Sequence, residues 1–155
     1  MDLTFVKDIC DNNIVITKNN QKTMNWILPY IDECINMVEP KGSVLEIGFG
    51  VGYSATKICS HPDVRKYTVI EYNPMLWDEI ESWKIKMNLE TNIDINLIKG
   101  RWQDVLQTLG KYDSIYFDNN DNKSSIHEID NNINNFMCEI LQKHVNINCR
   151  IYNFN

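Results

Sequence analysis

The sequence lacks a long hydrophobic run, an excess of basic residues and a regular cysteine pattern. No apolar run approaches the roughly 18 residues that a membrane-spanning helix needs, so we expect no membrane partner. Lys and Arg number 15 against 21 Asp and Glu, which gives a formal net charge of −6. Because a general binder of phosphate backbones needs a basic face, this balance argues against a nucleic-acid partner.

The cysteines form neither a metal motif nor a disulfide framework. Their number is odd, no two fall in a C-x-x-C pair, and the histidines show no ligand spacing. We therefore expect no metal site and a reducing compartment. The first residues also lack the apolar segment of a secretory signal, which favours a cytoplasmic location. The cysteines are Cys10, Cys34, Cys59, Cys138 and Cys149.

What the chain does contain is a regular alternation of expected strands and helices. Apolar residues recur at helical spacing over residues 24–38, and further helices are expected over about 53–60, from Pro74 and behind Ser125. Strands that alternate with helices predict a parallel sheet covered on both faces, in an α/β fold that is doubly wound and Rossmann-like. The five expected strands are SVLEIGF (43–49), KYTVIEY (66–72), DINLIKG (94–100), YDSIYFD (112–118) and INCRIYNF (147–154).

We expect one domain over residues 1–155. Its first part, residues 1–40, is expected to be a helical segment, and residues 41–155 form the Rossmann-like core. No repeat and no Pro/Gly/Ser-rich linker divides the chain.

The stretch VLEIGFGVGYSA (44–55) places three glycines directly after the most hydrophobic strand. Glycine is favoured where the backbone turns tightly or lies close to a ligand. The spacing is E-x-G-x-G-x-G, which disfavours the G-x-G-x-x-G loop of nicotinamide-dependent oxidoreductases. Glu71 ends the second strand, where an acid can accept hydrogen bonds from both hydroxyls of a ribose. The alternative is that Glu71 caps the next helix.

These residues resemble the class I S-adenosylmethionine-dependent methyltransferases, and among them the guanidinoacetate N-methyltransferase type. The resemblance covers about residues 24 to 120, and Gly100-Arg101-Trp102 is the piece most specific to this branch. It implies S-adenosylmethionine as cofactor and a small-molecule acceptor as partner. It also implies that the usual last strands of the methyltransferase sheet are lacking here. The matching stretches are MNWILPY, VLEIGFGVG, VIEYN with the later GRWQDV, and YDSIYFDN.

The resemblance also implies roles for single residues around the cofactor. Glu46 would lie near the amino end or the sulfonium, and Glu71 would hold the ribose. Trp102 and Gln103 follow the third strand, where the family binds adenine. The family usually has an acid at the Gln103 position. For Trp102, packing in the hydrophobic core is an equally good explanation. The backbone passing under the methionine moiety and ribose would be that of Gly48, Gly50 and Gly52.

On the acceptor side, the resemblance implies that Asp118 is the catalytic acid that orients and deprotonates the attacking nitrogen. Asp118 is alternatively a cap of the next helix. Asn119 and Trp26 would contact the substrate. Ile27 follows Trp26 where the guanidinoacetate enzymes have a glutamate that clamps the guanidinium, which argues against guanidinoacetate itself.

We therefore expect an S-adenosylmethionine-dependent methyltransferase that acts on nitrogen in a small molecule. The alternative is a non-catalytic protein that binds S-adenosylmethionine or S-adenosylhomocysteine, or a subunit completed by a partner chain. The last expected strand would have an unpaired edge, and such edges invite pairing with another chain. We therefore expect a homo-oligomer formed through this C-terminal edge strand.

Overall fold

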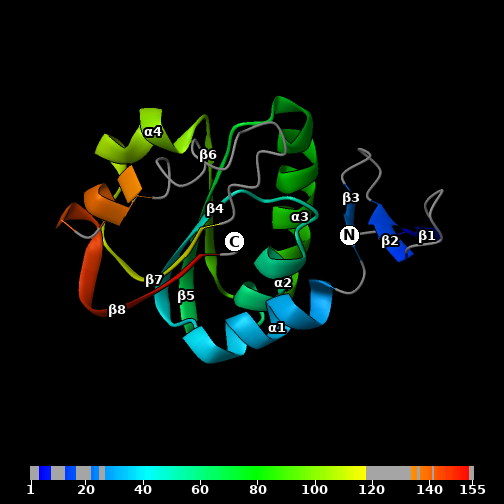
Figure 1. Ribbon diagram of the computed structural model, residues 1–155, viewed down its shortest axis with the longest axis horizontal. Helices are drawn as coiled ribbons and strands as arrows, with labels where there is room; N and C mark the ends of the chain where they lie inside the picture. The colour runs from blue at the N-terminus through cyan, green and yellow to red at the C-terminus, as the bar shows by residue number, and fades with distance from the viewer. Residues whose placement is uncertain are drawn as a thin grey trace.

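The computed structural model describes residues 4–7, 13–16, 22–24, 27–117, 134–135, 137–140 and 142–153. Among them, no helix is both long enough and apolar enough to cross a membrane. The described residues form two sheets, a small antiparallel one near the N-terminus and a larger parallel one (Figure 1). The roles predicted for Trp26, Asp118 and Asn119 fall on residues outside the described ones.

The small sheet contains β1 (Thr4–Lys7), β2 (Asn13–Ile16) and β3 (Lys22–Met24), paired antiparallel in that order. It corrects the expectation of a helical segment over residues 1–40, where the described helix is α1 (Ile27–Val38). The physical reason is composition, because β-branched residues dominate the strands and favour extended backbone. Met24, whose spacing suggested the helix, belongs to β3 instead.

The main sheet confirms the expected fold. Its strand order is β6-β5-β4-β7-β8, and each adjacent pair is parallel. The chain runs outward from β4 through β5 to β6, then crosses back to β7 and continues to β8. The strands are β4 (Gly42–Ile47), β5 (Val64–Glu71), β6 (Asp94–Lys99), β7 (Tyr112–Phe117) and β8 (Val145–Asn153).

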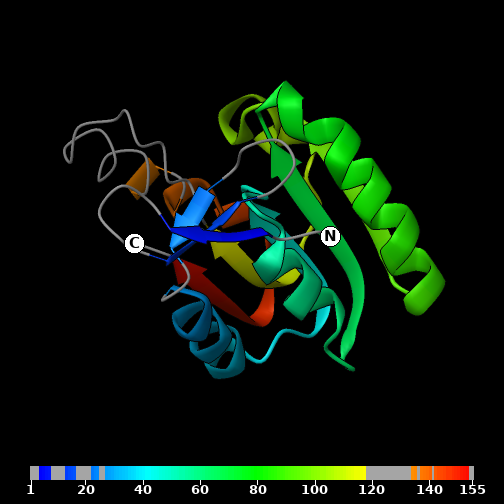
Figure 2. The ribbon, with the colours of Figure 1, turned by 90° about the vertical axis from the view of Figure 1, so that its right-hand side faces the viewer.

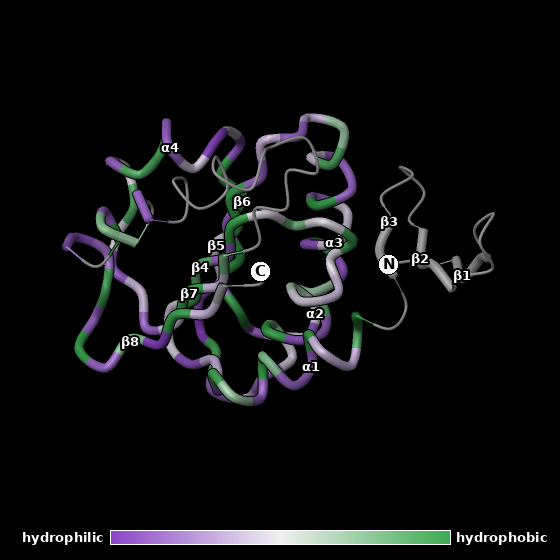
Figure 3. The backbone as a smooth tube through the Cα atoms, viewed as in Figure 1, coloured by the Kyte–Doolittle hydropathy of each residue, from purple (hydrophilic) through white to green (hydrophobic). Residues whose placement is uncertain are grey.

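Helices cover both faces of this sheet (Figures 1 and 2). One face packs against α1, α2 (Tyr53–Cys59) and α3 (Trp77–Glu90), while α4 (Trp102–Val105) packs on the other. Short 3₁₀ turns, η1 (Pro74–Leu76) and η2 (Leu106–Thr108), precede α3 and follow α4. The hydrophobic colours in Figure 3 follow the central strands, as expected for strands buried on both faces.

The direction of α1 relative to β8 follows from two contacts. Arg150 donates to the backbone oxygen of Val38, the last residue of α1. Tyr152, two residues further along β8, contacts Cys34 and Tyr30, which lie earlier in α1. The helix therefore runs opposite to β8, and its first turns lie at the carboxyl edge of the sheet.

The fold places the glycine stretch where parallel α/β sheets bind their ligands. Beyond β4 the connections diverge, since β5 lies on one side of β4 and β7 on the other. Ligands of such sheets bind outside the carboxyl ends of the strands at this divergence. The glycine loop, residues 48–52, starts at this point.

Candidate functional site

The glycine loop adopts a backbone that only glycine accommodates well. Gly48, Gly50 and Gly52 all have positive φ, at 88°, 53° and 71°. The Gly52 N–H donates to the carbonyl of Phe49 at 2.8 Å, which closes a tight turn before α2. A Cβ added at Gly50 would meet nothing within 4 Å, so the loop faces open space at this residue. The loop thus exposes backbone toward the carboxyl edge of the sheet.

Glu71 joins this loop to the end of β5. One carboxylate oxygen accepts the N–H of Phe49 at 2.9 Å, and the other accepts the N–H of Asn73 at 2.7 Å. Its backbone carbonyl accepts from Gly100, which follows β6, and from the Trp77 indole. The side chain is buried. Each carboxylate oxygen has two lone pairs, so Glu71 retains acceptor capacity beyond these two bonds.

The helix cap proposed for Glu71 is formed mainly by its neighbour. Asn73 accepts the N–H of Met75 with its side-chain oxygen, and Pro74 begins the 3₁₀ turn, as the sequence predicts. Glu71 contributes by accepting the N–H of Asn73. Glu71 is therefore hydrogen-bonded both to the start of the next helical segment and to the glycine loop.

Glu46 lies inside the core, on the face of β4 that packs against α2. Its side chain is fully buried, and one oxygen accepts the Ser54 hydroxyl at 2.5 Å. The other oxygen accepts the hydroxyl of Tyr67 from β5. Burial, together with the nearby Glu46 charge, raises the pKa of Tyr67 well above its usual value. Glu46 is thus bonded to Ser54 in the first turn of α2 and to Tyr67 in β5.

Trp102 and Gln103 follow β6 in the first turn of α4. Trp102 is buried, and its ring meets Phe117 edge to face with 6.0 Å between centroids. This packing agrees with its explanation as a core residue. Gln103 is exposed beside it. The structure brings both to the edge of the sheet where Glu71 ends β5, since Glu71 pairs with Lys99 of β6.

A cluster that the sequence analysis missed joins α1 to the start of α2. Tyr53, which directly follows Gly52, donates to Asp32 at 2.8 Å. Lys57 forms an ion pair with the other Asp32 oxygen at 3.2 Å and lies over the Tyr53 ring. Burial, then the Asp32 hydrogen bond, raises the pKa of Tyr53. Only the i, i+4 spacing of Tyr53 and Lys57 was visible in the sequence.

A second missed cluster joins α1 to β8. The hydroxyls of Tyr30 and Tyr152 are 2.7 Å apart, and the Cys34 thiol donates to the Tyr152 oxygen at 2.7 Å. Burial raises the pKa of Tyr152, with further contributions from Cys34 and Tyr30. No short-range sequence pattern predicts this contact, because Tyr30 and Tyr152 are far apart in the chain.

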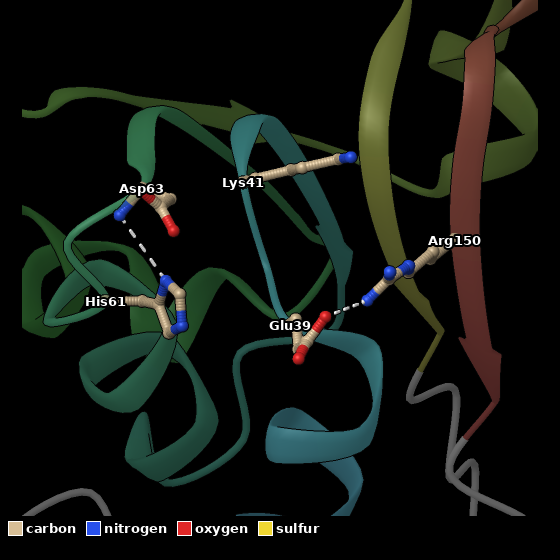
Figure 4. A pocket seen from close by; sticks show the side chains of 5 residues that line it. All are labelled: Glu39, Lys41, His61, Asp63 and Arg150. Atoms are coloured by element: carbon tan, nitrogen blue, oxygen red, sulfur yellow. Dashed lines mark hydrogen bonds and ion pairs between the residues drawn. The ribbon is translucent and has the colours of Figure 1, made fainter.

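A charged hollow of about 290 Å³ lies at the opposite edge of the sheet (Figure 4). Arg150 and Glu39 form an ion pair in it, with 2.5 Å between the charged atoms. The hydrogen bond from Arg150 and its positive charge lower the pKa of Glu39. Because Lys41 and Asp63 directly precede β4 and β5, the hollow is separated from the glycine loop by the length of the sheet. The lining residues are Glu39, Lys41, His61, Asp63 and Arg150.

Comparison with solved structures shows the same fold in several proteins. The SAH-bound methyltransferase PaMTH1 of Podospora anserina matches with a TM-score of 0.61 and 22% identity, over 85% of this chain and 53% of that one. The O-methyltransferase TomG of Streptomyces achromogenes, in complex with SAM, matches with a TM-score of 0.55 and 18% identity, over 81% and 53%. Precorrin 8W decarboxylase of Methanobacterium thermoautotrophicum matches with a TM-score of 0.59 and 15% identity, over 96% and 68%.

The chain spans about half the length of the first two of these structures. At these identities the likeness establishes the fold. The family is established by sequence: a model described as guanidinoacetate N-methyltransferase matches residues 8–154, which is nearly the whole chain. The chain therefore belongs to the guanidinoacetate N-methyltransferase family.

Proposed function

We propose that this protein is an S-adenosylmethionine-dependent methyltransferase that methylates nitrogen in a small molecule. The observation that carries the proposal is the position of Glu71, a buried carboxylate that ends β5 and touches the glycine loop. Family membership supports the same activity. The structural neighbours bound to SAH or SAM support the cofactor, while the choice of nitrogen as the methylated atom rests on the family alone.

The described residues fit a nucleoside-containing cofactor. Glu71 keeps lone pairs for the two ribose hydroxyls. Gly50 has open space where a side chain would stand, so a ligand can approach the loop backbone closely. Gln103, exposed after β6, carries a carbonyl oxygen that can accept from the amino group of adenine.

When bound, S-adenosylmethionine would supply a methyl group on a positively charged sulfur. The chain's own contribution is mainly to position the reactants, which can account for a large part of such a rate enhancement. In this proposal Asp118 accepts a hydrogen bond from the acceptor nitrogen and takes its proton. The nitrogen lone pair would then form the new bond to the methyl carbon, while the methyl–sulfur bond would break and leave its electron pair on the sulfur. Trp26 and Asn119 contact the acceptor, and Ile27 supplies no carboxylate for a guanidinium.

Cofactor binding is tested by a thermal-shift panel with S-adenosylmethionine, S-adenosylhomocysteine and NAD. At about 100 times its dissociation constant, a ligand adds roughly 2.7 kcal/mol of stability, or a shift of about 5–10 °C for this size of domain. We expect the shift with the first two ligands and none with NAD. Glu71→Ala should abolish most of it, Glu71→Gln should keep part, and Glu90→Ala, at an exposed acid of α3, should keep all. Equal shifts in wild type and Glu71→Ala would contradict the ribose assignment.

Methyl transfer is tested with Asp118→Asn on a panel of small amines and guanidines. We expect S-adenosylhomocysteine affinity to stay within a few-fold while turnover falls by at least about 100-fold, the usual scale for loss of an acid–base group. Full turnover in this variant would refute the role of Asp118. Tight cofactor binding by the wild type without transfer to any acceptor would favour the alternative of a binding protein or of a subunit completed by a partner.

A further inference from the structure

Trp83 in α3 contacts the glycine loop directly at one residue and through a hydroxyl at another. Its indole N–H donates to the Thr56 hydroxyl at 2.9 Å, and that hydroxyl donates to the carbonyl of Gly52 at 2.7 Å. Its ring meets the ring of Phe49, a loop residue, edge to face with 5.2 Å between centroids. Figure 1 shows α2 and α3 on the same side of the main sheet, where they share one core. One side chain of α3 therefore acts on both Phe49 and Gly52.

The direction of both hydrogen bonds is fixed by the groups themselves. An indole N–H can only donate, and a backbone carbonyl can only accept. The Thr56 hydroxyl has one proton, so it accepts from Trp83 and donates to Gly52. Because hydrogen bonds in a chain polarise one another, donation by the indole strengthens the bond to the Gly52 carbonyl. The same carbonyl also accepts the backbone N–H of Thr56 at 3.1 Å, so the last glycine of the loop is bonded twice to α2.

Phe49 is held by its backbone as well as by its ring. Its N–H donates to the Glu71 carboxylate at 2.9 Å, while its ring packs against Trp83. Both aromatic side chains are buried. The acid proposed for the ribose and the indole of α3 therefore fix the same loop residue from two directions.

A loop with three glycines depends on such contacts to keep one conformation. Glycine loses more conformational freedom on ordering than any other residue, and all three loop glycines have positive φ. The loop faces open space at Gly50, whereas the contacts of Phe49 and Gly52 lie toward α2 and α3. A loop that is ordered before its ligand arrives avoids paying this entropy on binding. Contacts from α3 to the loop should therefore raise the affinity for its ligand.

We propose that Trp83 is a positioning residue that keeps the glycine loop in its cofactor-binding conformation, through Thr56 and through Phe49. The proposal rests on the proposed function and deepens it by naming what holds the cofactor loop from outside. The place of Trp83 on the buried face of α3 explains its packing but not the hydrogen bond of its N–H. That bond leads to the loop.

The test measures S-adenosylhomocysteine affinity by calorimetric titration, at a temperature at which every variant is folded. Thr56→Val removes the hydroxyl and keeps the branched shape, and Trp83→Phe removes the indole N–H. We expect each variant to bind about 3- to 10-fold more weakly than wild type, the scale of one hydrogen bond. Thr56→Ser keeps the hydroxyl and should keep the wild-type affinity. In the double variant the loss should be smaller than the product of the two single losses, because both act through the same bond.

Two further measurements separate loop positioning from a loss of stability. Met87→Ala removes a buried side chain one turn further along α3, so it should lower the melting temperature and leave the affinity unchanged. Hydrogen exchange of the ligand-free protein reports on the loop itself. Relative to the amides of β4, exchange at the Phe49 and Gly52 amides should be faster in Thr56→Val and Trp83→Phe, and unchanged in Met87→Ala.

The proposal is wrong if Thr56→Val and Trp83→Phe bind S-adenosylhomocysteine as tightly as wild type, or if Met87→Ala weakens binding as much as they do. An equal loss of affinity in Thr56→Ser and Thr56→Val would also contradict it, as would unchanged relative exchange at the two loop amides. If the wild type does not bind S-adenosylhomocysteine at all, the proposed function is refuted. The exchange measurement then still decides whether Trp83 holds the loop.

Discussion

Two acids at neighbouring strands of the sheet have different surroundings. Glu71 accepts hydrogen bonds from backbone N–H groups at the rim, whereas Glu46 accepts from Ser54 and Tyr67 in the core. The sequence predicted that Glu46 lies two residues before the first glycine of the loop and that Glu71 ends the second strand. It did not predict the partners of Glu46, since Tyr67 reaches it only through the pairing of β4 with β5.

The buried carboxylate of Glu46 makes a testable contribution to stability. Tyr67→Phe removes a donor to it, and loss of a hydrogen bond to a charged buried group costs about 1.5–3 kcal/mol. We expect urea denaturation to show a fall of that size in the free energy of unfolding. Adding Glu46→Gln to Tyr67→Phe should recover part of the loss, because an amide is cheaper to bury than a carboxylate. Strictly additive losses would show that the two residues do not interact.

At the scale of elements, two glycines beside β4 are required for different physical reasons. Gly42, which begins β4, and Gly50, in the loop that follows it, both have positive φ. Their surroundings differ: a Cβ on Gly42 would overlap the Asp113 carboxylate, with the Asp113 Cγ at 2.9 Å, whereas one on Gly50 meets nothing. Asp113 cannot easily move aside, because Ser43 and Asn146 both donate to its carboxylate. The sequence shows a glycine at both positions, but it does not reveal that a side chain is excluded by Asp113 at Gly42 and by backbone conformation alone at Gly50.

Alanine at these two glycines should therefore separate stability from binding. Gly50→Ala carries the left-handed backbone cost alone, about 1–2 kcal/mol, and we expect it to weaken S-adenosylhomocysteine binding. Gly42→Ala adds the clash with Asp113 and should lose more stability, with unchanged affinity in the fraction that folds. Thermal unfolding and calorimetry measure both effects. A larger stability loss for Gly50→Ala would contradict this account of the two turns.

At the scale of the whole molecule, the main sheet was predictable and the path of β8 was not. Buried parallel strands are apolar runs bounded by turn residues, so the main strands of the sheet are visible in the sequence. In β8 the pairing moves from Val145 opposite Tyr112 to Arg150 opposite Ser114, which leaves an irregular stretch between. Asn148 has positive φ there, and Asn146 bonds to Asp113. These features depend on neighbours in space.

The outer edge of β8 leads us to predict that copies of this chain associate with one another. Within the described residues β8 pairs with β7 alone, and Ile147 in its irregular stretch is 94% exposed. We expect light scattering at high micromolar concentration to show a homo-oligomer, which Ile147→Lys should weaken because a charge on an edge strand disfavours pairing. Leu89→Lys, at a similarly exposed apolar residue of α3, is the control and should leave the mass unchanged. A monomeric wild type would refute this prediction.

The central position of β4 also has a consequence for synthesis of the chain. One edge of β4 pairs with β5, which follows closely in the chain. The other edge pairs with β7, which is synthesised later and whose Ile115 lies opposite Leu45. During translation the first half of the sheet therefore emerges with an open, apolar edge. Contacts between distant residues form slowly, and transiently open strand edges promote aggregation. The glycine loop acquires its second flanking strand late, so a ligand at this site can stabilise the finished domain but cannot assist its early folding.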